Sequence, residues 1–160
     1  MELISVIVIL FITLVMAIYM GFFIYGFVSA GPYVGVAKRD LDSVLVELND
    51  GTGKTLLDLG SGDGKIVFAA AKRGYGATGI EINPVLYMYS KLKKLLIHAS
   101  KATFIIDNIW TAPLDSYDIV TCYLFPEARE KVRKRFIAEA KSGAVLVLFK
   151  NGGGFETIKK

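Results

Sequence analysis

The chain has 160 residues, which suits one domain, but 53% of them are hydrophobic and the mean hydropathy is +0.47. This hydropathy is too high for an ordinary soluble protein of that size. The net charge of +4 is modest, so it fits a surface that meets anionic lipid or an acidic partner and does not by itself indicate nucleic-acid binding.

The N-terminal segment carries the excess of apolar residues. The stretch Leu3–Val28 is apolar apart from Ser5, Thr13 and two glycines. At about 1.5 Å per residue it extends about 39 Å, enough to cross a bilayer core of about 30 Å. We therefore expect a transmembrane helix over residues 1–30. A cleaved signal peptide is the alternative, but Glu2 stands where such a peptide needs basic residues, and the apolar core is too long.

Basic residues follow this segment rather than precede it. Lys38 and Arg39 come soon after it, whereas only the amino terminus and Glu2 lie before it. The positive-inside rule therefore predicts a single-pass membrane protein with its catalytic part in the cytoplasm. Cys122, the one cysteine, cannot form an internal disulfide and fits a reducing compartment.

Residues 31–54 are expected to form a connector and a covering helix. Glycine and proline in 31–35 break the first helix, and an apolar stripe at helical spacing follows, made of Leu41, Val44, Leu45 and Leu48. This helix would cover the sheet of a third segment, residues 55–160.

A glycine-rich turn lies at the centre of that segment. The stretch Leu56–Glu81 is typical of a strand, a glycine turn, a helix and a second strand. Two phosphate-binding motifs do not fit it. A dinucleotide fingerprint needs a glycine where Lys65 stands, and a P-loop ending at Gly53 needs one where Leu48 stands.

The acids and glycines that remain favour a different ligand. Asp58 can hold an ammonium group, Gly60 and Gly62 let a ligand approach the backbone, and Glu81 can accept both hydroxyls of a ribose. These residues predict a ligand with an amino-acid end and a ribose. His98 has no ligand spacing around it, so no metal site is expected.

The rest of the chain continues the alternation of strands and helices. A helix begins at Asn83 and Pro84, and we expect Val85, Met88, Leu92 and Leu95 to face inward, with Lys91, Lys93 and Lys94 on a solvated surface. Strands follow at 102–107, 117–124 and 144–149. We expect Cys122 to be packed inside the strand at 117–124. The last two strands flank a helix from about 125 to 140. This helix is basic, and its charged side faces solvent or lipid or, alternatively, binds RNA. The basic residues are Arg129, Lys131, Arg133, Lys134 and Arg135. The glycine-rich tail leaves room for one short strand and not for a hairpin of two. We therefore expect the sheet to keep an exposed edge after the strand at 144–149.

Four motifs occur in order: Pro32-Tyr33-Val34-Gly35, Asp58–Gly64, Glu81-Ile82-Asn83-Pro84 and Asp107-Asn108-Ile109-Trp110. With the apolar N-terminal helix, they resemble class I S-adenosylmethionine-dependent methyltransferases, and more specifically the lysine methyltransferases related to the enzyme that methylates the ATP synthase c-subunit. The resemblance implies a doubly wound Rossmann-like sheet of order 3-2-1-4-5, with strands 6 and 7 absent or reduced. It also implies S-adenosyl-L-methionine as cofactor, held by Asp58, Gly60, Ser61, Gly62, Glu81, Ile82, Asp107 and Asn108.

The resemblance further implies that Tyr33 lies over the cofactor or the substrate entrance. An acceptor lysine also needs an aromatic channel that lowers its pKa, and we expect Tyr33, Tyr123, Phe125 and Trp110 to line it, with Tyr33 and Phe125 positioning the substrate. The predicted activity is therefore that of a membrane-anchored protein-lysine N-methyltransferase, whose partner is a protein with accessible lysines. A methyltransferase for a lipid or small membrane-borne substrate and a non-catalytic membrane scaffold remain alternatives. Nucleic acid is not expected, because 123–126 lacks the polar residue and paired prolines that hold a planar amino group.

Overall fold

The computed structural model describes residues 2–30, 35–36, 38–47, 50–150 and 152–160. Its elements follow one another in the order α1 (Glu2–Ala30), α2 (Lys38–Glu47), β1 (Thr55–Leu59), α3 (Lys65–Lys72), β2 (Gly76–Glu81), α4 (Pro84–Leu96), β3 (Ala102–Ile106), β4 (Ile119–Cys122), α5 (Pro126–Glu139), β5 (Val145–Phe149) and β6 (Phe155–Lys159).

The strands form one sheet in the order β3-β2-β1-β4-β5-β6. Strands β1 to β5 pair in parallel, and β6 runs antiparallel to β5. The predicted order 3-2-1-4-5 is confirmed, and the reduced C-terminal part of the sheet is one strand of five residues. The predicted exposed edge at β5 is wrong, because the chain turns back through glycines 152–154, all with positive φ, and β6 pairs with β5.

Both faces of the sheet are covered by apolar side chains, as expected for a parallel sheet with crossover helices. Alternation along β1 places Leu56 in the core shared with α2 and α3, and Leu57 in the core shared with α5. Cys122 of β4 is fully buried, which confirms its prediction as a packed strand residue. On α2, Val44 is buried and Leu41 packs on the same core, whereas Leu45 and Leu48 lie outside the described side chains.

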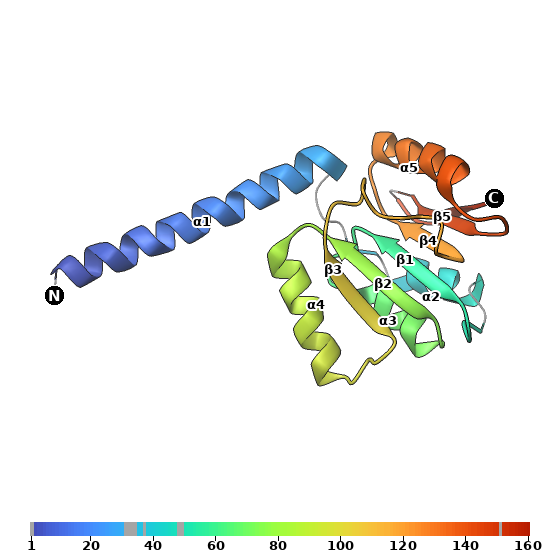
Figure 1. Ribbon diagram of the computed structural model, residues 1–160, viewed down its shortest axis with the longest axis horizontal. Helices are drawn as coiled ribbons and strands as arrows, with labels where there is room; N and C mark the ends of the chain where they lie inside the picture. The colour runs from blue at the N-terminus through green and yellow to red at the C-terminus, as the bar shows by residue number, and fades with distance from the viewer. Residues whose placement is uncertain (1, 31–34, 37, 48–49, 151) are drawn as a thin grey trace.

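Helix α1 extends away from the rest of the chain (Figure 1). Its stretch Leu3–Tyr25 is long and apolar enough to cross a membrane, and none of it is buried against the domain. The structure thus agrees with the prediction of a candidate membrane anchor, since an apolar helix without protein around it suits an apolar solvent.

Helix α4 contradicts the predicted packing. Val85, Met88, Leu92 and Leu95 were expected to face inward, but they are between 54% and 69% exposed. The buried residue of this helix is Ser90, whose hydroxyl donates to the carbonyl oxygen of Gly62 at 3.1 Å. The expectation is wrong because helical spacing shows only that these apolar residues lie on one side of the helix. It does not show whether that side packs on the protein.

Candidate active site

The predicted acids gather at the carboxyl edge of the sheet. Asp58 is the fourth residue of β1, Glu81 ends β2, and Asp107 follows β3. Strands β1, β2 and β3 are parallel neighbours, so their carboxyl ends meet at one edge. This edge includes the point between β1 and β4 where the strand order reverses, which is the usual ligand crevice of open parallel sheets.

The glycine turn after β1 is shaped by its backbone. Gly60, Gly62 and Gly64 have φ values of 76°, 54° and 76°, a region that residues with a Cβ rarely adopt. The amides of Gly60 and Ser61 both donate to the carbonyl oxygen of Ile80 at 2.9 Å. The turn is therefore held against β2, and its glycines are required by the backbone before any ligand is considered.

Glu81 joins this turn to the start of α4. Its carboxylate accepts from the amide of Gly62 and from the amide of Asn83, each at 2.8 Å. A carboxylate has about four acceptor positions, so two remain for a ligand. Ile82, next along the chain, is half-buried between these anchors. Asn83 caps α4 by accepting from the amides of Val85 and Leu86.

Asp58 is a buried carboxyl group. It is 2% exposed and accepts a hydrogen bond from the hydroxyl of Thr121 at 2.8 Å. Burial raises its pKa from 3.8 to about 7; the bond from Thr121 opposes that shift, and the nearby charges of Glu81 and Asp63 add to it. No ion pair to Asp58 is found among the described residues, so a cationic ligand would compensate its charge.

The surroundings of Asp58 fit an amino-acid group. A cleft is lined by Val36, Asp58, Gly60, Ser61, Asp63, Lys65, Ile66 and Tyr123. The hydroxyl oxygen of Ser61 is buried there without a hydrogen-bond partner in the described part of the chain. Lys65 pairs with Asp63 at 3.1 Å and remains partly exposed. An ammonium and a carboxylate arriving together would thus find an acid, a hydroxyl and a lysine.

The segment after β3 forms the other end of the site. Asp107 is exposed and accepts from the amide of Asn108 at 2.6 Å and from the hydroxyl of Thr111 at 3.3 Å. Asn108 accepts from the amide of Trp110 at 3.1 Å and donates its side-chain amide to the hydroxyl of Tyr25 at 3.0 Å. The end of α1 therefore contacts a predicted cofactor residue, a neighbour that the sequence did not indicate.

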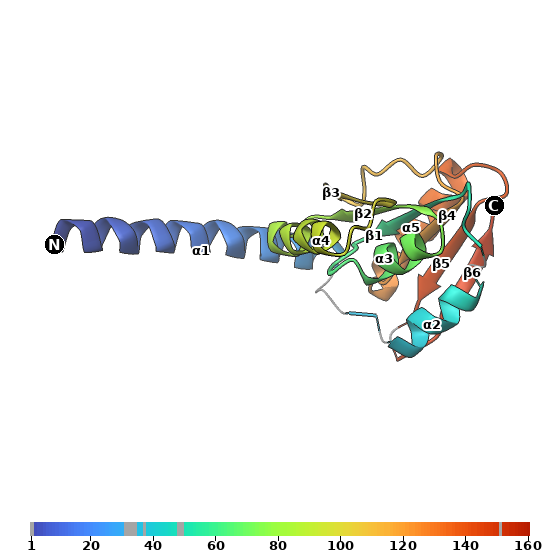
Figure 2. The ribbon, with the colours of Figure 1, turned by 90° about the horizontal axis from the view of Figure 1, so that it is seen from below.

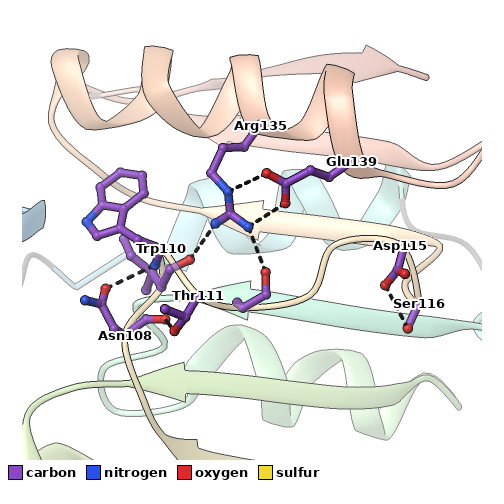
Figure 3. Close-up of polar contacts among 9 residues, drawn as sticks. Asn108, Trp110, Thr111, Asp115, Ser116, Arg135 and Glu139 are labelled. Carbon is purple, nitrogen blue, oxygen red and sulfur yellow. Dashed lines mark hydrogen bonds and ion pairs between the residues drawn. The ribbon is translucent and has the colours of Figure 1, made fainter.

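Arg135 of α5 holds the same segment in place (Figure 3). Its guanidinium group donates to the carbonyl oxygens of Ile109 and Ala112 at 3.0 and 2.9 Å and pairs with Glu139. The basic pattern of α5 predicts a solvated, lipid-facing or RNA-binding side chain for Arg135, but this side chain is mostly buried, at 18% exposure. The available signal was Glu139 four residues later, the spacing of a helical ion pair.

The aromatic residues predicted to surround the acceptor do not pack in one place. Tyr123 packs on the core shared with α3, and Trp110 packs on the core shared with α5. Phe125 is 40% exposed just after β4, next to the start of α5. Tyr33 lies outside the described residues. No cluster of three metal-binding side chains is found in the parts of the chain that the structure describes.

Comparison with known proteins decides the class of this site. The chain matches the family described as "ANTKMT methyltransferase domain" over residues 58–150, from the buried acid of β1 to the residue after β5. The chain belongs to this family. The ANTKMT family match confirms the predicted class, S-adenosylmethionine-dependent methyltransferases with a Rossmann-like sheet.

Two curated relatives and one solved structure define the family neighbourhood. The ATP synthase c-subunit lysine N-methyltransferase of Rattus norvegicus is 35% identical over 72% of this chain and 54% of its own length. The adenine nucleotide translocase lysine N-methyltransferase of Mus musculus is 34% identical over 72% and 51%. An RNA methyltransferase from Salinibacter ruber, solved with S-adenosyl-L-homocysteine, is 32% identical over 72% of this chain and 76% of its own, with a TM-score of 0.64.

This ANTKMT family chain spans about half the length of the curated relatives it matches. The solved neighbour contains the demethylated form of the predicted cofactor, which agrees with S-adenosyl-L-methionine as the cofactor of this class.

Proposed function

We propose that this chain is an S-adenosylmethionine-dependent protein-lysine N-methyltransferase held at a membrane by α1. The observation that carries the proposal is the family match over residues 58–150. This range contains Asp58, Glu81 and Asp107, the three acids that the fold brings to one edge. The activity, the acceptor and the membrane are parts of the same proposal and are tested separately below.

The residues of the candidate site divide between the two ends of the cofactor. S-adenosylmethionine supplies an activated methyl group when bound. Asp58 would hold the ammonium of its amino-acid end, beside Gly60, Ser61 and Gly62, and Lys65 would meet its carboxylate. At the other end, Glu81 would accept the ribose hydroxyls, and the adenine would lie near Ile82, Asp107 and Asn108.

The acceptor lysine sets a second requirement on the chain. A free lysine has a pKa of about 10.4, so holding its amine neutral at pH 7 costs about 4.6 kcal/mol, and only the neutral amine has a lone pair for methyl transfer. Apolar and aromatic surroundings lower that pKa by desolvation. We assign this role to Phe125, which is 40% exposed at the start of α5, and to Tyr33. The work of the protein is then to align the amine and exclude water.

Protein lysine is the acceptor class that the relatives support. Both curated relatives are named as lysine N-methyltransferases, one for the c-subunit of ATP synthase and one for adenine nucleotide translocase. We extend the lysine acceptor to this chain and propose that its protein substrate lies at the membrane, because a catalytic segment attached to α1 has a limited reach.

RNA is a second candidate acceptor because of the solved neighbour at 32% identity. The basic helix α5 is poorly suited to bind it. Arg129 donates to the carbonyl oxygen of Phe149 at 3.1 Å, Arg133 pairs with Glu156 at 2.9 Å, and Arg135 is held as described above. These guanidinium groups are already used inside the domain, which leaves fewer charges for phosphates.

The orientation proposed for the chain follows from its charges. Lys38 and Arg39 follow α1 and favour the cytoplasmic side for the site, in a single-pass arrangement. Protease treatment of sealed vesicles made from producing cells tests this. The segment after α1 should be degraded when added protease reaches the cytoplasmic side and protected when it reaches the opposite side; the reverse pattern would contradict the orientation.

The activity is tested with the full chain in detergent micelles, radiolabelled S-adenosylmethionine, and a cell extract that contains membranes. Label should enter protein on lysine side chains, mapped by mass spectrometry. Asp58→Ala should abolish the labelling, whereas Asp115→Ala, at an exposed aspartate outside the site, should retain it. Label only in lipid or only in RNA would replace the proposed acceptor, and the absence of label despite cofactor binding would favour the scaffold.

A further inference from the structure

Helix α4 has an apolar surface that no described part of the chain covers. Six of its residues are between 51% and 72% exposed: Val85, Met88, Tyr89, Leu92, Leu95 and Leu96. At 100° per residue they form one continuous arc of the helix, opposite the buried Ser90. A contiguous exposed apolar patch of this kind marks an interaction surface.

Lysines border this apolar arc on both sides. Lys91 lies next to one edge and Lys93 next to the other, and α4 contains no acidic residue. The ammonium of Lys91 lies 5.7 Å from the Tyr87 ring, and that of Lys93 lies 5.0 Å from the Phe68 ring. An apolar arc bordered by lysines is typical of helices that lie in the interface of a bilayer with anionic lipid, with the lysines reaching toward the headgroups.

The position of α4 relative to α1 favours the same occupant. Figure 1 shows α4 running across the direction of α1 from a start beside its C-terminal part, and Figure 2 shows α4 end-on in the same place. The candidate membrane span ends at Tyr25, whose hydroxyl is bound to Asn108 of the candidate site. A bilayer crossed by α1 would therefore have its surface along α4.

We propose that the apolar arc of α4 docks on the surface of the bilayer that α1 crosses. The apolar side chains insert at the boundary between headgroups and acyl chains, and Lys91 and Lys93 contact anionic headgroups. This second attachment fixes the rotation of the domain, which a single helix cannot do. It holds the carboxyl edge of the sheet close to the membrane. The docking itself does not depend on methyl transfer, so it can fail while the proposed function holds.

The test measures the depth of labelled positions in the full chain, reconstituted in vesicles of phosphatidylcholine and phosphatidylglycerol. An environment-sensitive fluorophore is attached to Leu92→Cys on α4. The matched control is Ile137→Cys on α5, because the two native side chains are 58% and 54% exposed. Met16→Cys on α1 reports insertion of the first helix. The native Cys122 is fully buried and stays unlabelled.

We expect spin-labelled lipids to quench the label at position 92 at least about threefold more than the label at position 137, and aqueous iodide to show the reverse order. Iodide access at position 92 equal to that at position 137 would overturn the proposal, whether or not position 16 is in lipid. Protection of position 92 from both quenchers would also overturn it, because the arc would then be covered by protein, such as a second copy of the chain.

A second variant separates lipid docking from packing. Met88→Glu combined with Leu92→Glu places two charges in the arc without touching the buried side of α4. A label at Leu96→Cys should lose its lipid quenching in this background while the label on α1 keeps it. Methylation of a soluble lysine peptide should be unchanged by the two glutamate substitutions. If lipid quenching at position 96 is also unchanged, the proposal is overturned.

Discussion

Helices α3 and α4 are built alike and used differently. Both follow a strand of the same parallel sheet, both begin at the candidate site, and both carry an apolar stripe. Helix α3 buries its stripe of Ile66, Val67 and Ala70 against the sheet, whereas α4 buries Ser90 and exposes its stripe. The difference shows that an apolar stripe does not by itself place a helix face in the core. The stripe of α3 packs in the core, whereas that of α4 is exposed among the described residues.

The largest effect is expected from placing a charge in each stripe. Val67→Asp should lower the free energy of unfolding by more than about 4 kcal/mol, because it buries an unpaired charge at a position with no exposure. Leu92→Asp should change it by less than about 0.5 kcal/mol, as at other exposed positions. Denaturant titration of the full chain in detergent measures both. Equal destabilisation would show that α4 packs on protein, and the comparison would fail.

The next effect concerns Asp58, the acid of β1 that precedes the glycine turn and α3. Asp58→Ala should weaken the binding of S-adenosylhomocysteine about a hundredfold, because the ligand ammonium loses its buried partner, a loss of about 3 kcal/mol. The fold should survive, since Thr121 keeps Leu57 as an acceptor at 3.4 Å. Calorimetry measures the affinity, with Asp115→Ala as the control. An unchanged affinity would remove the basis for assigning Asp58 to the cofactor.

The raised pKa of Asp58 predicts a pH dependence. Between 3.8 and about 7 the native state binds a proton that the unfolded state has released, so the contribution of Asp58 to stability falls as pH rises through this range. Binding of a ligand ammonium needs the ionised carboxylate, so affinity for S-adenosylhomocysteine should increase about tenfold from pH 5.5 to pH 7. Asp58→Asn should show a flat profile over the same range; a wild-type profile that is equally flat would contradict the assignment.

The smallest effect concerns the polar contact by which α4 packs. Ser90→Ala should lower the free energy of unfolding by about 1 kcal/mol, because the carbonyl oxygen of Gly62 loses the buried hydroxyl that donates to it. The loss should also loosen the glycine turn and modestly weaken cofactor binding. Ser43→Ala is the control, since that hydroxyl makes an exposed bond within α2. An effect no larger than the control would show that α4 is held by other contacts.

Much of the candidate site followed from local chemistry. The glycines after Asp58 need φ values that favour glycine, and the apolar run before it needs a buried strand, so a strand and tight turn were predictable from the residues alone. Asn83 and Pro84 specify the start of α4 in the same local way. The assignment of these residues to a cofactor stays a prediction, as do the substrate roles of Tyr33 and Phe125.

Contacts between distant segments could not be predicted in this way. Nothing near Asn108 in the chain indicates Tyr25, and nothing near Ile109 indicates Arg135, because each pair meets only when the sheet has assembled. The pairing of β6 with the edge of β5 likewise needed the finished turn at 152–154.

The sequence by itself determined the order of the elements, the glycine turn, the acids at the strand ends and the apolar span of α1, because each depends on neighbouring residues. The tertiary structure decided which side of α4 is buried. Helical periodicity is a property of one segment, whereas burial depends on the surface opposite. Here Ser90 is the buried residue of α4, and the apolar arc stays exposed among the residues that the structure describes.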